Sequence, residues 1–298
     1  MNALLDRFAV QLDSPRFQRQ AVAALAMLAA VAFVVLAWLP ALALFVSLGL
    51  LLAALLVALM RIASVKQRQA LDDIKRHVAE RESAIYGCIE ARLALDKLVG
   101  PSFELPPMRG PVISPDAAWR IYRHVLAERP EVVVEFGSGV STLLLSHALE
   151  RNGSGRVVSL DHEARFAAET RELIERHGLG HRAEVFHAPL RDVHANEGPC
   201  STFYDPAPLE GIERVGLVLV DGPPRGVHPE VRHLALPLMA SKLKPGGMLL
   251  LDDAARPGER SVLERWREAF PGFTFEELPL DTGLAWVRKR GNAGEAAR

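Results

Sequence analysis

The 298-residue chain has little cysteine and almost no net charge. Its two cysteines, Cys88 and Cys200, are too few for a disulfide framework or a multi-cysteine zinc site. Its 35 basic and 36 acidic side chains leave a formal net charge of -1, which excludes the strongly basic surface of a typical nucleic-acid-binding protein. With 49% hydrophobic residues, the chain is not wholly disordered. We therefore expect folded domains and no nucleic-acid partner.

Charged residues are also absent from residues 21–60. A membrane-spanning helix needs about 20 apolar residues to cross about 30 Å of hydrocarbon, so this run is long enough for two spans. Pro40, near the centre of the run, is expected to break the helix and form a turn. The sequence thus predicts a two-helix transmembrane hairpin over 21–60. A cleaved signal peptide or a buried pair of soluble helices is less consistent with so long an apolar run.

Basic residues flank the apolar run on both sides: Arg7, Arg16 and Arg19 precede it, and Arg61, Lys66, Arg68, Lys75 and Arg76 follow it. The positive-inside rule places both flanks in the cytoplasm. We therefore predict an inner-membrane or plasma-membrane protein whose N-terminal segment, 1–20, and C-terminal part both face the cytoplasm.

Residues 61–98 are charged, lack proline and are predicted to form a helical stalk. Apolar residues recur at intervals of seven in two series, Leu71, Val78 and Ile85 in one and Ile74, Cys88 and Leu95 in the other. Such heptads are typical of a coiled coil, which would form a homodimer through 61–98. Arg81 and Arg92 interrupt the series, so the favoured alternative is a single amphipathic helix lying against the domain that follows.

Residues 99–290 are predicted to form one α/β domain, and 291–298 a flexible tail. Apolar runs predict strands at 131–136, 156–160, 183–187, 216–220, 248–251, 273–278 and 283–288. Helical segments are expected at 140–150, 163–177, 229–243 and 259–269. This alternation predicts a doubly wound, mostly parallel seven-stranded sheet. The short connection at Asp281-Thr282 predicts that the last two strands form an antiparallel hairpin at an edge.

A glycine turn follows the first predicted strand, in the order Glu135-Phe136-Gly137-Ser138-Gly139. Glycines at this place let the backbone turn tightly and approach a ligand. Asp161 ends the second predicted strand, where a carboxylate can accept hydrogen bonds from both hydroxyls of a ribose. Thr142 stands where the dinucleotide fingerprint requires glycine or alanine, which disfavours an NAD(P)-dependent oxidoreductase.

On these residues, 112–290 resembles the class I S-adenosylmethionine-dependent methyltransferases, which have a Rossmann-like fold. The resemblance implies that Glu135, Gly137, Ser138 and Gly139 lie at the cofactor, near its methionine part, and that Asp161 binds its ribose. The turn over 244–247 is similar to the turn that precedes the fifth strand in this family. The loop 187–190 lacks the family's common acidic contact to adenine, which leaves the backbone of Ala188 or stacking for that role.

Three further acids are predicted at strand ends. Asp221 closes the fourth strand, and Asp252 and Asp253 close the fifth. Carboxylate oxygens grouped in this way suit Mg²⁺ or a similar divalent cation. The spacing is similar to the metal triad of the catechol O-methyltransferase-like branch, where the metal orients an acceptor hydroxyl and lowers its pKa. In the alternative without metal, Asp221 contacts the cofactor or acts as a base alone, while Asp252 or Asp253 caps the next helix.

His228 lies on the loop after Asp221 and is a second candidate base. The sequence as a whole predicts a membrane-anchored O-methyltransferase acting on a small-molecule, lipid or lipid-linked acceptor. The remaining alternative is a membrane-anchored scaffold that binds the cofactor without turnover.

Overall fold

The computed structural model describes residues 15–100, 105–108, 110, 112–193 and 201–291. The chain divides into two compact units, Met1–Val78 and Ala79–Arg298. Residues 1–14 of the predicted N-terminal segment, Cys200, and residues 292–298 of the predicted tail lie outside the described residues.

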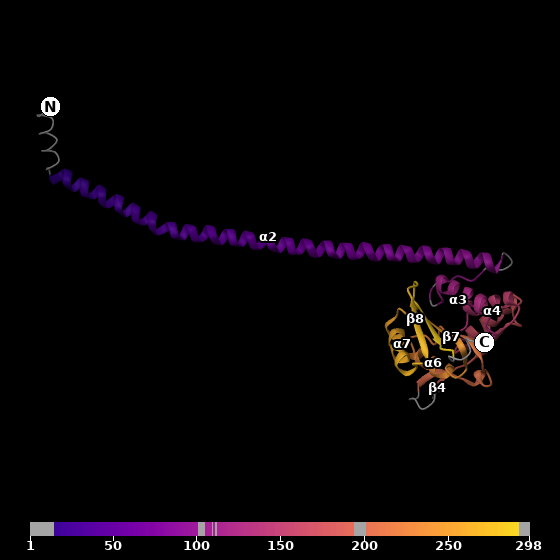
Figure 1. The fold of residues 1–298 in the computed structure, drawn as a ribbon. Coiled ribbons are helices and arrows are strands. Elements are labelled where there is room, and N and C mark those ends of the chain that lie inside the picture. Colours follow the sequence, from indigo (N-terminus) through magenta and orange to yellow (C-terminus); the bar gives the residue numbers. More distant parts are fainter. Residues whose placement is uncertain (1–14, 101–104, 109, 111, 194–200, 292–298) are drawn as a thin grey trace. The chain divides into compact units, whose positions relative to one another are not determined.

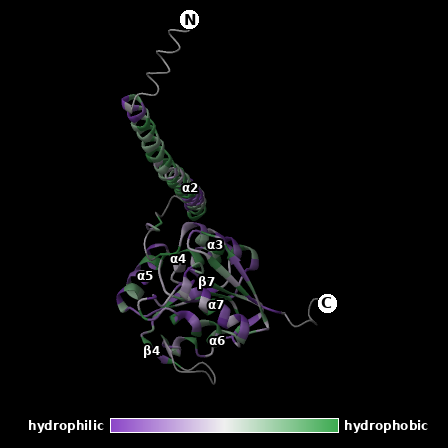
Figure 2. Ribbon diagram, turned by 90° about the vertical axis from the view of Figure 1, so that its left-hand side faces the viewer, coloured by the Kyte–Doolittle hydropathy of each residue, from purple (hydrophilic) through white to green (hydrophobic). Residues whose placement is uncertain are grey.

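A single helix, α2 (Pro15–Val99), contains the whole apolar run. It continues through Pro40 without the turn that the sequence predicted. Proline removes one backbone hydrogen bond, but the alanine- and leucine-rich sequence on both sides of it strongly favours helix, so the hydrogen-bond ladder resumes. Figure 2 shows the green, hydrophobic colouring of this stretch. By length and composition the helix could cross a membrane, and none of its most apolar window is buried in the protein.

The last turns of α2 belong to the second unit and pack against it. Ala91, Leu95 and Val99 are buried, whereas Ile85 is exposed. The Arg92 guanidinium donates hydrogen bonds to the carbonyls of residues 105 and 106, at 2.7 and 2.8 Å. Arg92 therefore links the end of the helix to the start of the domain, which explains a charge inside the apolar series.

A seven-stranded sheet forms the centre of the second unit (Figure 1). Its strands are β1 (Val132–Phe136), β2 (Arg156–Asp161), β3 (Ala183–His187), β6 (Val215–Val220), β7 (Leu243–Asp252), β8 (Phe273–Leu278) and β9 (Leu284–Lys289). Their order is β3-β2-β1-β6-β7-β9-β8. The pairings from β3 to β7 are parallel, and β9 is antiparallel to both β7 and β8. The predicted mostly parallel sheet and its antiparallel edge hairpin are confirmed.

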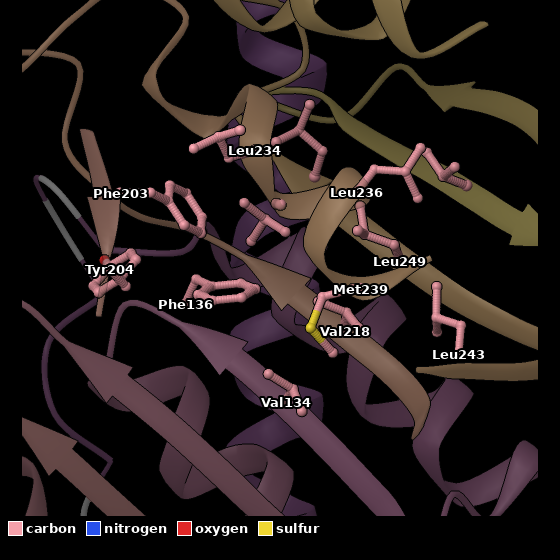
Figure 3. Packing of buried hydrophobic residues seen from close by; sticks show 14 of the residues in the cluster. Val134, Phe136, Phe203, Tyr204, Val218, Leu234, Leu236, Met239, Leu243 and Leu249 are labelled. Carbon is pink, nitrogen blue, oxygen red and sulfur yellow. The ribbon is translucent and has the colours of Figure 1, made fainter. Parts of the chain in front are cut away.

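Alternate strand residues enter two separate cores, one on each face of the sheet. In β1, Val133 belongs to one core and Val134 to the other. The first core also receives buried residues of α3 (Pro115–Glu128), α4 (Val140–Asn152) and α5 (Ala164–Arg176). The second core, shown in part in Figure 3, receives those of α6 (Ala235–Met239) and α7 (Pro257–Ala269). Helices thus cover both faces, as the doubly wound prediction requires.

Two segments differ from the prediction. The helix expected over 229–243 is replaced by the 3₁₀ helix η2 (Val231–Leu234) and the short α6. Pro237 lies in the first turn of α6, where its missing N–H costs no intrahelical hydrogen bond, so a new α-helix begins just before it and does not run continuously from residue 229. The segment before β6 forms a small antiparallel sheet of β4 (Leu190–Val193) and β5 (Ser201–Tyr204), followed by the 3₁₀ helix η1 (Ala207–Leu209).

Candidate active site

The predicted acidic and glycine residues meet at one edge of the large sheet. β2, β1, β6 and β7 are consecutive neighbours and run parallel, so their carboxyl ends share this edge. Asp161, Asp221 and Asp252 stand at or just beyond the ends of β2, β6 and β7. Doubly wound sheets bind ligands outside these strand ends, where the strand order reverses direction. Here that reversal lies at β1.

The turn after β1 requires glycine at position 137. Gly137 has a φ of +99°, and its N–H donates to the carbonyl of Leu160 at 2.8 Å. A Cβ at this position would lie 3.1 Å from the backbone nitrogen of Gly222. The turns after β1 and β6 are therefore packed closely, and a side chain at position 137 would push them apart.

Glu135 is fully buried beneath the glycine turn. Its Oε2 accepts hydrogen bonds from the hydroxyls of Thr142, at 2.5 Å, and Ser159, at 2.7 Å, while its buried Oε1 has no partner. Burial raises the pKa of this carboxyl to about 7. The Thr142 hydroxyl also accepts from the N–H of Gly139 at 3.0 Å. Thr142 thus joins Glu135 to the glycine turn. This explains why threonine stands where the dinucleotide fingerprint has glycine or alanine.

Asp161 and Ser138 form a connected pair. Asp161 Oδ2 accepts from the Ser138 N–H at 3.0 Å and from its hydroxyl at 2.7 Å. Asp161 Oδ1 accepts from the Glu163 N–H at 3.0 Å. An ionised carboxylate has about four acceptor sites, so Asp161 can still receive a ribose hydroxyl. The N–H of Ala188 donates to the Asp161 carbonyl at 2.7 Å, so of the backbone groups of Ala188 only its carbonyl remains for adenine.

The structure brings Asp221, Asp252 and Asp253 together. One carboxylate oxygen from each lies within 4.8 Å of the other two. Burial raises the pKa of Asp221 to about 7. Burial, followed by the neighbouring Asp221 carboxylate, raises the pKa of Asp252 well above its usual range. Asp252 Oδ1 is buried without a hydrogen-bond partner, so the cluster still has an oxygen for a ligand.

Sequence reasoning missed Arg232, a buried residue of η2 that lies among these acids. Its guanidinium donates to the Asp221 carbonyl at 2.6 Å and the Asp252 carbonyl at 3.0 Å. It also pairs with Asp253 Oδ2 at 3.2 Å, and Arg256 pairs with the same oxygen at 2.5 Å. Asp253 is thus neutralised by two cations, whereas Asp221 and Asp252 are less compensated. The only sequence signal was one arginine near the start of a mostly apolar segment.

Tyr204, at the end of β5, is a second residue that sequence reasoning missed. Its side chain is buried, and its ring packs on Phe136 and Phe203 with centroid distances of 5.6 and 5.3 Å (Figure 3). Its hydroxyl has no hydrogen-bond partner and lies where a Cβ on Gly222 would be. Burial raises the pKa of this phenol well above 10, so the hydroxyl stays protonated. No motif in the sequence pointed to it.

The structure places His228 outside the group of buried and partly buried acids. It is exposed on the loop after Asp221, and its Nδ1 accepts a hydrogen bond from the Glu230 N–H at 3.1 Å. Its role as a base stays a prediction.

The chain contains a known type of domain at this site. Residues 134–254 match the family model described as "Methyltransferase domain". The matched segment runs from β1 to just past Asp253, and so includes each of the predicted cofactor-binding, catalytic and metal-binding residues. This match confirms the predicted class of enzyme, an S-adenosylmethionine-dependent methyltransferase. No curated protein matches the chain.

Several solved structures are similar to the chain. A methyltransferase from Geobacter sulfurreducens has 17% identity and a TM-score of 0.46, covering 60% of this chain and 81% of its own. The SAH-bound methyltransferase of Podospora anserina has 16% identity and a TM-score of 0.47, with coverages of 70% and 87%. The O-methyltransferase from Bacillus cereus in complex with SAH has 18% identity and a TM-score of 0.46, with coverages of 69% and 91%.

Proposed function

We propose that this protein is a membrane-anchored enzyme that transfers the methyl group of S-adenosylmethionine to an acceptor oxygen. The observation that carries the proposal is a group of buried polar atoms without hydrogen-bond partners. Of six such atoms among the described residues, four lie on strands or loops at the ligand-binding edge of the sheet: Glu135 Oε1, His162 Nδ1, Tyr204 Oη and Asp252 Oδ1. Because buried polar groups are normally paired, their concentration at one edge supports a ligand there.

The residues at the glycine turn fit S-adenosylmethionine. The turn at Gly137 and Gly139 leaves backbone close to the sheet edge, Glu135 offers an unpaired carboxylate oxygen, and Asp161 with Ser138 offers acceptors for a ribose. Ala188 would contribute its backbone carbonyl or its packing surface. The bound cofactor supplies an electrophilic methyl group. The chain's own residues hold the cofactor and acceptor in line and remove the acceptor's proton.

Asp221 is the residue we assign to the acceptor side, with His228 as the second candidate. A pKa of about 7 lets Asp221 accept a proton near neutral pH. An acceptor hydroxyl is the group whose proton such a carboxylate would take, which favours oxygen as the methylated atom. The acceptor class we propose is a small molecule, a lipid or a lipid-linked compound.

A divalent cation such as Mg²⁺ fits the acid cluster. Asp221 and Asp252 would provide ligand oxygens and Asp253 a third, because Asp252 Oδ1 is unpaired and oxygen-rich sites suit hard cations. Bound there, the cation would lower the pKa of an acceptor hydroxyl. A metal-free form of the site is favoured by a different observation: Arg232 already supplies a positive charge to these acids.

Residues 21–60 are the proposed membrane anchor. At 1.5 Å per residue, a continuous helix of this length would extend about 60 Å, twice the hydrocarbon thickness of a bilayer. A chain that folds back at Pro40 would place all of the apolar run in the hydrocarbon and both basic flanks on the cytoplasmic side. The length of the apolar run therefore supports two spans and a cytoplasmic catalytic domain, with a turn at Pro40 in the membrane in place of the continuous α2 described above.

A homodimer through residues 61–98 stays a proposal. Leu71, Ile74, Val78 and Ile85 are exposed along α2, which leaves an apolar stripe for a second copy to cover. Sedimentation of the detergent-solubilised chain tests it: Val78→Glu should convert a dimer to a monomer, and a wild-type monomer would contradict it.

Methyl transfer can be tested with the full chain in membrane vesicles. We would add S-adenosylmethionine with a labelled methyl group together with separated lipid and soluble metabolite fractions. The proposal expects labelled product carrying a methyl ether or ester, identified by NMR, and no product with Asp221→Asn. Product labelled on nitrogen or carbon would contradict oxygen as the acceptor atom, and absence of cofactor binding would contradict the function itself.

A further inference from the structure

The hydroxyl of Tyr204 is held between two turns of the candidate active site. The antiparallel register of the small sheet pairs Tyr204 with Leu190, and the rings of Phe203 and Tyr204 pack on Phe136 of β1, which places the end of β5 beside the large sheet. The phenol oxygen occupies the point where a Cβ on Gly222 would stand, and the Cα of Gly137 lies 3.3 Å from that hypothetical Cβ. The oxygen is therefore placed where the turns after β1 and β6 approach each other.

Packing accounts for the aromatic ring but not for the hydroxyl. The ring fills a pocket formed with Phe136 and Phe203, and a phenylalanine would fill the same space. A buried hydroxyl without a partner is unfavourable, whereas its replacement by hydrogen would remove the cost. We therefore attribute the hydroxyl to a polar or charged partner on a ligand, which is present only when that ligand is bound in the site.

The position of the hydroxyl indicates which part of the cofactor it meets, on the assumption that the proposed function is correct. The turn at Gly137 lies at the methionine part, and Asp161 lies at the ribose. The sulfur joins these two parts of S-adenosylmethionine and must therefore lie between them. The Tyr204 hydroxyl and the Cα of Gly137 both lie beside the point that a Cβ on Gly222 would occupy, and Asp161 is among the charged groups that act on the phenol.

We propose that the Tyr204 hydroxyl faces the sulfonium of S-adenosylmethionine and favours this charged substrate over its neutral thioether product. A neutral phenol keeps oxygen lone pairs that attract the positive sulfur and the polarised C–H groups around it. The same lone pairs gain little from the uncharged sulfur of S-adenosylhomocysteine. Tyr204 is on this account a positioning residue that discriminates by charge.

The test compares the affinities of the full-length chain for the two cofactor forms by calorimetry. Tyr204→Phe should weaken binding of S-adenosylmethionine by about five- to tenfold and change binding of S-adenosylhomocysteine by less than about twofold, since only the charged form loses an electrostatic contact. The melting temperature without ligand should be unchanged or higher. Tyr122→Phe is the matched control: its hydroxyl pairs with His147 Nδ1 at 3.0 Å on α4, and its loss should leave both affinities unchanged.

The remaining outcomes overturn the proposal in distinguishable ways. Equal weakening of both ligands would place the hydroxyl at a part that they share, such as the ribose. Unchanged affinities would show that Tyr204 does not meet the cofactor. A wild-type chain that binds neither ligand would overturn the proposed function together with this inference. If Tyr204→Phe does not fold, Gly222→Ala provides a second variant, because its methyl group displaces the hydroxyl and should cause the same selective loss.

Discussion

The hydroxyl of Tyr204 occupies the space that a side chain at position 222 would need. Gly222→Ala should therefore be destabilising by about 1–3 kcal/mol, the usual cost of inserting a methyl group into a packed interior. Removing the hydroxyl with Tyr204→Phe frees that space, so the double variant should recover most of the loss. Chemical denaturation of the detergent-solubilised chain, followed by tryptophan fluorescence, measures this coupling. Additive effects of the two substitutions would show that the residues are not in contact.

Glu135 predicts a dependence of stability on pH. Its pKa is about 7 in the folded protein and about 4.3 in an unfolded chain, so folding favours the protonated form. Its contribution is fully present below about pH 4 and is lost as the pH rises through 7. Between pH 5 and pH 8 the loss should reach about 2–3 kcal/mol.

Glu135→Gln isolates this effect, since glutamine does not titrate. The free energy of unfolding of the wild type, minus that of the variant, should fall from pH 5 to pH 8. Subtracting the variant removes most of the contributions of Asp221 and Asp252, whose pKa values are also raised, although the Glu135 charge itself adds to the rise at Asp221. A difference that stays constant with pH would mean that Glu135 is already ionised at pH 5.

Asp161 should be required for cofactor affinity. Asp161→Ala removes the acceptor of two hydrogen bonds from Ser138 as well as the ribose acceptor, so binding of S-adenosylmethionine should weaken by at least about tenfold. Asp192→Ala is the control, because Asp192 is an exposed acid of β4 in the same unit. Calorimetry that gives the same affinity for Asp161→Ala and wild type would remove Asp161 from the site.

The sequence was most informative where the local pattern and the tertiary structure agree. The strand of valines before Glu135 is buried on both faces, and its apolar run was sufficient to predict it. The glycine turn and the acids at strand ends were also predictable, because parallel topology brings strand ends together. Proline was the least reliable local signal: α2 continues through Pro40, and Pro237 lies inside α6, while the helix expected over 229–243 is divided between η2 and α6.

Arg232 and Tyr204 could not be predicted because their roles depend on burial and not on a motif. Nothing local to position 232 shows that four acidic side chains surround it, and these come from β6 to α7: Asp221, Asp252, Asp253 and Glu259. Similarly, an unpaired hydroxyl is visible only once the β4–β5 sheet is placed against β1. Such contacts join segments that are far apart in the chain, so they cannot be predicted from the spacing of residues in the sequence.

Membrane topology can be measured directly. Reporter enzymes fused at residues 10 and 70 should both be active in the cytoplasm, since two spans return the chain to the side on which it began. A third fusion after residue 298 serves as the control for the catalytic domain. Fusions at 10 and 70 that report opposite compartments would establish a single span and contradict the predicted turn at Pro40.

The negative charge of the acid cluster can be compensated either by a divalent cation or by Arg232, and the effect of a chelator distinguishes the two. With a divalent cation, a chelator should abolish methyl transfer, and Mg²⁺ or Mn²⁺ should restore it. Asp252→Asn should then raise the metal concentration needed for half-maximal activity while leaving cofactor affinity nearly unchanged. Full activity in excess chelator would instead favour the metal-free site, with Asp221 as the base and Arg232 as the compensating charge.

Arg232→Met provides the complementary measurement. Removing the guanidinium leaves the buried Asp253 and the partly buried Asp221 without their shared partner, so the chain should lose about 3–5 kcal/mol of stability. If a cation also binds at the cluster, adding Mg²⁺ should recover part of this loss, because the vacated position increases the negative charge that attracts it. The matched control is Arg265→Met. The guanidinium of Arg265 pairs with Glu230 at 2.6 Å and does not contact the three acids. Stabilisation by Mg²⁺ in Arg232→Met but not in this control would place the cation at the acid cluster, and equal responses would exclude it from there.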